Sequence, residues 1–208
     1  TGVRTDAREL ACDMVLLAIG VRPNTVLASE AGLEIGPTGG VAVNRSMQTS
    51  DPHIYAGGDC VETVHFLTGK PVRQPMGSTA NRHGRVIADA IAGRKSEFKG
   101  VLGTAILKVF ECTAGITGLS VDGAREAGFD PISISIMNSD KPHFMPGSAP
   151  VILRLVADRG TGKLLGAQAF GPGDVSKRID TLVAAITGGL TVDDLADADL
   201  AYAPPFST

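Results

Sequence analysis

The apolar positions near the start of the chain form one continuous run over residues 14–19, which Gly20 ends. A continuous run is typical of a strand buried on both faces of a parallel sheet, because a half-exposed strand alternates apolar with polar residues. We therefore expect a strand here, in an α/β layer. Downstream, Asn24 is expected to cap a short helix that extends to Ala31 and ends at Gly32.

Short segments with turn signals lead from this helix to a longer one. A glycine-rich turn predicts a short strand over residues 41–43, and a Ser-Asp-Pro turn predicts another over residues 53–56. Apolar residues then recur with helical spacing, which predicts a helix over residues 78–92 that Gly93 ends. Its apolar face is expected to comprise Ala80, Gly84, Ile87, Ala88 and Ile91.

After residue 98 the pattern becomes richer in strands, and we expect a second unit of the α+β class. One short helix is predicted over residues 121–127, closed by Gly128. The last two predicted strands flank residues 158–163, a polar segment with two glycines that predicts a hairpin turn. The predicted strands span residues 105–110, 131–137, 151–157 and 164–170.

A long helix is predicted to begin near Asp174 and to end at Gly188-Gly189. Thr191 and Asp194 then have the spacing of a weak capping box for a final short helix. The long helix should lie on the sheet with its apolar face, which comprises Ile179, Leu182, Val183 and Ile186.

Composition narrows the possible partners of this chain. Its 19 Lys and Arg residues are outnumbered by 22 Asp and Glu residues, and aromatic residues make up only 4% of the sequence. A nucleic-acid partner is therefore not expected, because such partners call for a basic face and stacking rings. Since the sequence contains neither an apolar run of membrane-spanning length nor a signal-peptide pattern, we expect no membrane association and a cytoplasmic location.

Three sets of potentially reactive residues are expected to be structural. Cys12, Cys60 and Cys112 are far apart and form no C-x-x-C pair, so reduced thiols are expected. Residues 160–163 are similar to a phosphate-binding loop, but two further residues that this motif needs are missing. The histidines lack the spacing of metal ligands and are expected on the surface or in loops, at His53, His65, His83 and His143.

The candidate chemistry lies in residues 49–59. Here the expected strand delivers Gly57, Gly58 and Asp59 to its C-terminal end, where open α/β sheets bind ligands. Glycines allow a bulky cofactor to approach the backbone, and a carboxylate can accept hydrogen bonds from hydroxyls such as those of a flavin ribityl chain. Taken alone, Gly-Gly-Asp is also an ordinary turn, and both interpretations remain open at this point.

The combination of this segment with three others resembles a known family. Residues 18–24 lie upstream, residues 77–85 lie downstream, and Tyr202-Ala203-Pro204-Pro205-Phe206 lies near the end of the chain. In order and spacing, these segments are similar to the FAD-dependent pyridine nucleotide-disulfide oxidoreductases, in the branch that contains CoA-disulfide reductase, NADH oxidase and NADH peroxidase. The resemblance covers essentially the whole chain.

The resemblance implies an α/β remnant of a FAD/NAD(P)-binding fold followed by an α+β dimerisation domain. Residues 1–22 would be the end of the NAD(P)H-binding domain, and residues 23–98 the second part of the FAD-binding domain. Residues 99–208 would be a truncated dimerisation domain, which forms a homodimer in the family. The chain begins without Met and stops just after a turn signal, so we expect it to be a fragment of a longer protein.

The resemblance also assigns roles to individual residues. Asn81 and Met145 match positions that contact the electron acceptor, although CoA-disulfide reductases carry His and Tyr there. Tyr202 would reach the flavin of the partner subunit, and the helix that begins near Ser78 would direct its positive end toward the flavin. Cofactor-binding roles are implied for Thr49, Ala56, Gly57, Gly58, Asp59, Ala80 and Tyr202.

No catalytic residue is assigned, because the redox cysteine of this family lies in a Ser-Phe-x-x-Cys segment that this sequence does not contain. Cys60 is therefore expected to be structural. The resemblance implies electron transfer from NADH or NADPH through FAD to a disulfide such as CoA disulfide or to a persulfide. Reduction of oxygen or peroxide on the same scaffold and a non-catalytic dimerisation module remain alternatives. Residues 1–208 alone are expected to hold little FAD and to be inactive.

Overall fold

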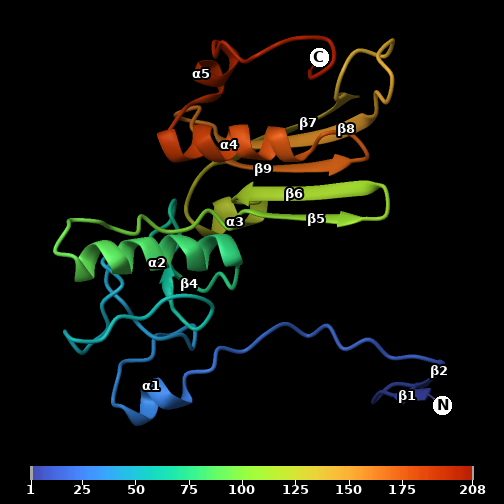
Figure 1. Cartoon of the computed structure of the whole chain (residues 1–208). Helices are drawn as coiled ribbons and strands as arrows, with labels where there is room; N and C mark the ends of the chain where they lie inside the picture. The colour runs from blue at the N-terminus through green and yellow to red at the C-terminus, as the bar shows by residue number, and fades with distance from the viewer. Residues whose placement is uncertain (1, 208) are drawn as a thin grey trace.

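The computed structural model describes residues 2–207, which form two units connected by residues 92–104. The first unit contains α1 (Val26–Glu30) and α2 (Gly77–Ile91), and it lies below the five-stranded sheet of the second unit in Figure 1. Within the described part of the chain, no helix has the length and apolar character needed to cross a membrane.

The N-terminal segment forms a small hairpin followed by an extended stretch. β1 (Gly2–Arg4) pairs with β2 (Glu9–Ala11) in antiparallel register. The buried strand predicted over residues 14–19 is wrong, because this segment is irregular and its Met14 and Ile19 are 84% and 90% exposed. A parallel strand needs hydrogen-bonding neighbours, and none of the described strands pairs with this segment.

The rest of the first unit contains few regular elements. α1 is confirmed, although its N-cap is one residue later than expected, at Thr25. The strands predicted over residues 41–43 and 53–56 are wrong, because each segment makes isolated bridges only. Turns on either side reverse the chain before a ladder can form. The regular ladder of this unit joins β3 (Thr63–Val64) to β4 (Pro71–Val72).

α2 has nearly the predicted bounds but buries a different face. Its buried residues are Thr79, His83 and Val86, whereas Ile91 of the predicted apolar face is 68% exposed. Polar side chains can occupy the interior where they find hydrogen-bond partners, as His83 does. The helix thereby contributes to the core of the first unit, which comprises Met47, Val61, Val86, Phe98 and Val101.

The second unit is built on one antiparallel sheet with the strand order β5-β6-β9-β8-β7. α4 (Ser176–Gly188) covers β6 and β9, and it lies in front of the sheet, at the level of β9, in Figure 1. α3 (Val121–Glu126) packs through Ala124 against Val156. The strands are β5 (Ala105–Val109), β6 (Cys112–Gly118), β7 (Pro131–Ser139), β8 (Pro150–Asp158) and β9 (Leu164–Gly171).

The four strands predicted for this unit and its short helix are confirmed, whereas β6 is an additional strand that the sequence pattern does not predict. The β6 sequence is rich in Gly, Thr and Ala and shows no clear alternation of apolar and polar residues. Its small residues have a packing role, because a Cβ on Gly115 would lie 2.7 Å from Cγ1 of Ile179 in α4. The helix therefore approaches the sheet closely at β6.

α4 confirms the predicted long helix and most of its predicted face. Its buried residues are Ile179, Leu182, Ala185 and Ile186, and Val183 is partly buried. The predicted capping box is complete, since the hydroxyl of Thr191 accepts a hydrogen bond from the backbone of Asp194. It begins α5 (Val192–Ala196).

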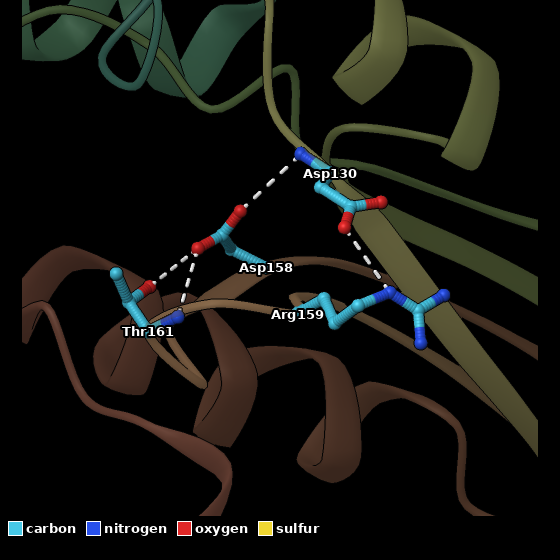
Figure 2. A network of polar contacts seen from close by, with 4 residues as sticks. All are labelled: Asp130, Asp158, Arg159 and Thr161. Atoms are coloured by element: carbon cyan, nitrogen blue, oxygen red, sulfur yellow. Dashed lines mark hydrogen bonds and ion pairs between the residues drawn. The ribbon is translucent and has the colours of Figure 1, made fainter.

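The segment between β8 and β9 is a hairpin turn, as predicted, and Asp158 organises it (Figure 2). The backbone N–H and hydroxyl of Thr161 donate hydrogen bonds to Oδ2 of Asp158 at 3.0 and 2.7 Å, and Asp130 N donates to Oδ1 at 3.3 Å. The Thr161 hydroxyl is the main cause of the lowered pKa of Asp158. Because Arg159 pairs with Asp130 at 3.1 Å, the turn satisfies its own polar groups.

The packing of β9 generates a test of the second unit. A Cβ on Gly166 would collide with the carbonyl oxygen of Leu119 and lie 2.6 Å from its backbone nitrogen. Gly166→Ala should therefore lower the free energy of unfolding of the full-length protein by about 1–3 kcal/mol, the usual range for overpacking. Urea unfolding measures this change.

Gly160→Ala is the matched control, because a Cβ there would have ordinary contact with Asp158 at 3.7 Å. We expect its unfolding free energy to stay within about 0.5 kcal/mol of the original, as at most surface positions. Equal stability of the two variants would contradict the described packing between β9 and Leu119.

Candidate functional site

The segment over residues 49–59 is a loop whose shape is set by Thr49. The Thr49 hydroxyl lies 3.1 and 3.0 Å from the carbonyl oxygens of Asp51 and Ile54, and it accepts a hydrogen bond from Asp51 N at 3.2 Å. Thr49 is only 9% exposed. Its hydroxyl therefore acts within the turn itself, and Ala56 fixes the other end of the loop by donating from its backbone to Met47 O at 3.0 Å.

The loop then passes very close to α2 at Gly57 and Gly58. A Cβ on Gly57 would lie 2.9 Å from Cδ1 of Ile87 and 3.1 Å from Cβ of His83. Gly58 has a φ of +92°, a conformation that side-chain-bearing residues rarely adopt, and it faces Ala80. Glycine suits both positions, because it avoids the tight contacts at Gly57 and adopts the positive φ of Gly58 without strain.

Asp59 follows at the surface. Its side chain is exposed and takes part in none of the hydrogen bonds or ion pairs formed within residues 2–207. The predicted residues Ala56, Gly57, Gly58 and Asp59 are thus brought together with Ala80 at one place. This place presents an unpaired carboxylate beside exposed glycine backbone, which suits a ligand with several hydroxyl groups.

α2 contributes the other side of the candidate site. Its N-cap, Met76, offers no side-chain hydrogen bond to the first turn, so the helix begins with uncapped backbone N–H groups. Such a terminus carries partial positive charge and favours negative charge nearby. Asn81 is exposed in the second turn of this helix.

His83 is the functional candidate that the sequence did not reveal. The prediction of a surface or loop histidine is wrong here, because His83 is 1% exposed and lies within α2. Its Nδ1 accepts a hydrogen bond from Gly58 N at 3.1 Å, and its ring meets Phe98 edge to face with centroids 4.4 Å apart. Burial, followed by the positive charge of Arg82, lowers the pKa of His83 to about 4.

Met145 and Tyr202 lie in the second unit, away from this loop. Met145 is partly buried in the segment between β7 and β8, where its backbone donates to Pro142 O at 2.9 Å. Tyr202 is 67% exposed and lines a hollow of about 260 Å³ together with Lys177 and Leu200. In Figure 1 the C-terminal segment lies above the sheet and α2 lies below it.

The thiols and histidines do not assemble into a reactive centre in the described chain. Cys12, Cys60 and Cys112 are free and partly buried, and Cys60 Sγ lies 3.8 Å from Gly57 O. Within residues 2–207, no three His, Cys, Asp or Glu side chains form a group that could hold a metal ion.

Comparisons with known proteins match both units. The first corresponds to the model of the pyridine nucleotide-disulphide oxidoreductase family over residues 2–84. The second corresponds over residues 104–208 to the model of the dimerisation domain of the same family.

Individual relatives agree with these matches. The chain is 43% identical over 205 residues to an NAD(P)H sulfur oxidoreductase (CoA-dependent) of Pyrococcus furiosus, covering 99% of this chain and 46% of the relative. It is 38% identical over 208 residues to an NADH oxidase of Methanocaldococcus jannaschii, covering 99% of this chain and 45% of that protein.

A solved structure gives the same result. The NAD-dependent persulfide reductase from A. fulgidus superimposes with a TM-score of 0.93 at 44% identity, over 99% of this chain and 40% of that one. The chain spans about half the length of the curated relatives it matches. On these matches, the chain belongs to the pyridine nucleotide-disulphide oxidoreductase family.

Proposed function

We propose that the protein containing this chain is a flavoprotein that transfers electrons from NADH or NADPH through FAD to a disulfide such as CoA disulfide or to a persulfide. Family membership supports the cofactor and the electron donor. The names of the Pyrococcus and A. fulgidus proteins, which refer to CoA-dependent sulfur and persulfide chemistry, support the acceptor class.

The observation that carries this proposal is the unpaired Asp59 carboxylate at the end of a glycine loop that rests on α2. Its chemistry fits FAD, because a carboxylate accepts strong hydrogen bonds from ribityl hydroxyls and the adjacent glycines leave the backbone accessible. The uncapped beginning of α2 adds partial positive charge that suits an electron-rich cofactor.

The residues of this chain would hold and orient the cofactor. Thr49 and Ala56 fix the loop, Gly57 and Gly58 bring its backbone against α2, and Asp59 would bind the hydroxyls. FAD, when bound, would accept a hydride from NAD(P)H and deliver electrons to the acceptor. The chain itself provides no redox cysteine in this proposal.

The domain assignment remains part of the proposal. Residues 1–22 would end the NAD(P)H-binding domain, residues 23–98 would complete the FAD-binding domain, and residues 99–208 would form the dimerisation domain. The match to a dimerisation-domain model supports a homodimer. We also propose a cytoplasmic location for the full-length protein.

The acceptor site would combine residues of both subunits. Asn81 and Met145 would line it, and Tyr202 would approach the flavin of the partner subunit. Asn81 and Met145 depart from the His and Tyr of CoA-disulfide reductases, and the Methanocaldococcus relative carries the name NADH oxidase. These observations keep reduction of oxygen or peroxide as the second candidate function.

Removal of the Asp59 carboxylate tests the cofactor site. In the full-length protein, Asp59→Ala should weaken FAD binding by about 10- to 100-fold, because a hydrogen bond to a charged group contributes roughly 1.5–3 kcal/mol. Flavin absorbance per protein after gel filtration and dilution measures the loss.

Asp122→Ala is the matched control, since Asp122 is an exposed carboxylate in α3 that pairs with Arg125 of the same helix. Its flavin content should equal that of the unmodified protein. Unchanged flavin content in Asp59→Ala would remove Asp59 from the site.

Tyr202 tests the proposed contribution of the partner subunit. Tyr202→Phe in the full-length protein should lower turnover with CoA disulfide at least several-fold, because the hydroxyl is lost from the acceptor site while the ring remains. Steady-state kinetics measure the effect, with flavin content and light scattering as controls for cofactor binding and dimerisation. Unchanged turnover would reduce Tyr202 to a packing residue, and a fall caused by loss of the dimer would do the same.

A further inference from the structure

His83 is a buried polar residue for which the proposed chemistry has no use. It is 1% exposed, although neutral or charged imidazole is costly to bury without hydrogen bonds. One ring nitrogen, Nδ1, accepts from Gly58 N at 3.1 Å, and the other, Nε2, is buried with no hydrogen-bond partner among residues 2–207. Since Nδ1 accepts, the ring is neutral with its proton on Nε2. The unsatisfied Nε2 costs free energy, which another contact of the ring is expected to offset.

The offsetting contact is with the loop over Gly57, Gly58 and Asp59, which the ring supports. The amide of Gly58 sits in the middle of the Gly-Gly-Asp turn, and His83 supplies its hydrogen-bond acceptor across 25 positions of sequence. A Cβ on Gly57 would lie 3.1 Å from Cβ of His83, so the loop backbone rests directly on this side chain. Asp59 is the next residue along the chain after Gly58.

The ring of His83 is itself fixed from the other side by Phe98. The two rings meet at 80° with centroids 4.4 Å apart, and Phe98 is only 4% exposed. The Arg82 guanidinium lies 4.9 Å from the Phe98 centroid, and Phe98 N donates to Arg45 O at 2.8 Å. Phe98 belongs to the connection between the two units, so this connection helps to hold the cofactor loop.

We propose that His83 is a positioning residue: held by Phe98, it fixes the Gly57-Gly58-Asp59 loop in the conformation that receives the FAD hydroxyls. The inference rests on the proposed function, because it assumes that this loop binds FAD. It adds a specific acceptor atom, Nδ1, on which the binding conformation depends.

Two substitutions distinguish the effect of losing the Nδ1 acceptor from the effect of changing the volume of the ring. His83→Phe keeps a ring and removes the acceptor, whereas His83→Asn can place an amide oxygen where Nδ1 lies. We expect FAD to bind full-length His83→Phe apoprotein about tenfold more weakly, since the Gly58 amide loses its partner. The His83→Asn variant should bind FAD within about threefold of the unmodified protein, as measured by flavin fluorescence titration.

His143→Phe is the matched control, because His143 is exposed and also lies beside a phenylalanine, Phe144. Equal FAD affinity of the His83→Phe variant and the unmodified protein would overturn the inference, and so would a His83→Asn variant that binds no better than His83→Phe. Failure of the unmodified full-length apoprotein to bind FAD would instead overturn the proposed function, and the inference with it.

A second readout uses pH and needs no cofactor. The pKa of His83 is lowered from 6.5 to about 4, so between these values the unfolded chain takes up a proton that the folded chain does not. This contribution to stability is complete above pH 6.5 and is lost as pH falls toward 4. The charge that acts on the ring is that of Arg82, the preceding residue on α2.

The thermal midpoint of the unmodified apoprotein should therefore fall between about pH 7 and pH 5 by more than that of His83→Asn. The difference arises because Asn cannot be protonated while it can still accept from Gly58. Parallel falls in the two proteins would show that the ring is not buried in the neutral form in which Nδ1 accepts from Gly58, and would overturn the inference.

Discussion

The close approach of the Gly57-Gly58-Asp59 loop to α2 is the constraint on which the candidate site depends. A Cβ at Gly57 would meet Ile87 and His83 at 2.9 and 3.1 Å, and the backbone of Gly58 adopts a left-handed conformation, so glycine allows the loop to approach the helix closely. From α2, Nδ1 of His83 accepts the hydrogen bond that the Gly58 amide donates. Asp59 follows these two glycines at the surface, and its carboxylate is unpaired within residues 2–207.

The two units maintain their shapes by different means. In the second unit, backbone ladders and the apolar face of α4 determine the structure, with Ile179 and Ile186 each 1% exposed. In the first unit, side chains bond to loop backbone: Glu62 accepts from both the backbone and hydroxyl of Thr38, and Asn44 accepts from Ser46 N and Gln48 N. The candidate site lies in the unit that depends on individual polar side chains.

This difference explains how much of the structure could be predicted from the sequence. The predicted strands of the second unit, α4 and the Thr191 capping box follow from local periodicity, and the structure confirms them. The buried strand over residues 14–19 is wrong because burial depends on neighbours that the local pattern cannot specify. β6 escapes prediction because its glycines and threonines suit the close packing of α4 and carry little strand signal.

The candidate site was predictable only in part. The motif located Gly57, Gly58 and Asp59, and the structure places Ala80 beside them. The role of Thr49 in its own turn and the burial of His83 depend on partners whose positions follow from the folded loop. The spacing of Thr79, His83 and Val86 on one helical face is a local signal that points to His83, but this face is more polar than the one that the apolar pattern favours.

A buried histidine with an unsatisfied Nε2 is less favourable for the core than an apolar residue would be. The presence of His83 in the core of the first unit therefore requires a compensating contact. An aliphatic side chain at this position would pack against Phe98 but would leave the Gly58 amide without an acceptor. With the positive φ of Gly58, its amide points toward α2, where it donates to Nδ1 of His83. The polar residue in the helix core is therefore the consequence of the loop conformation, and the loop conformation is what leaves Asp59 unpaired.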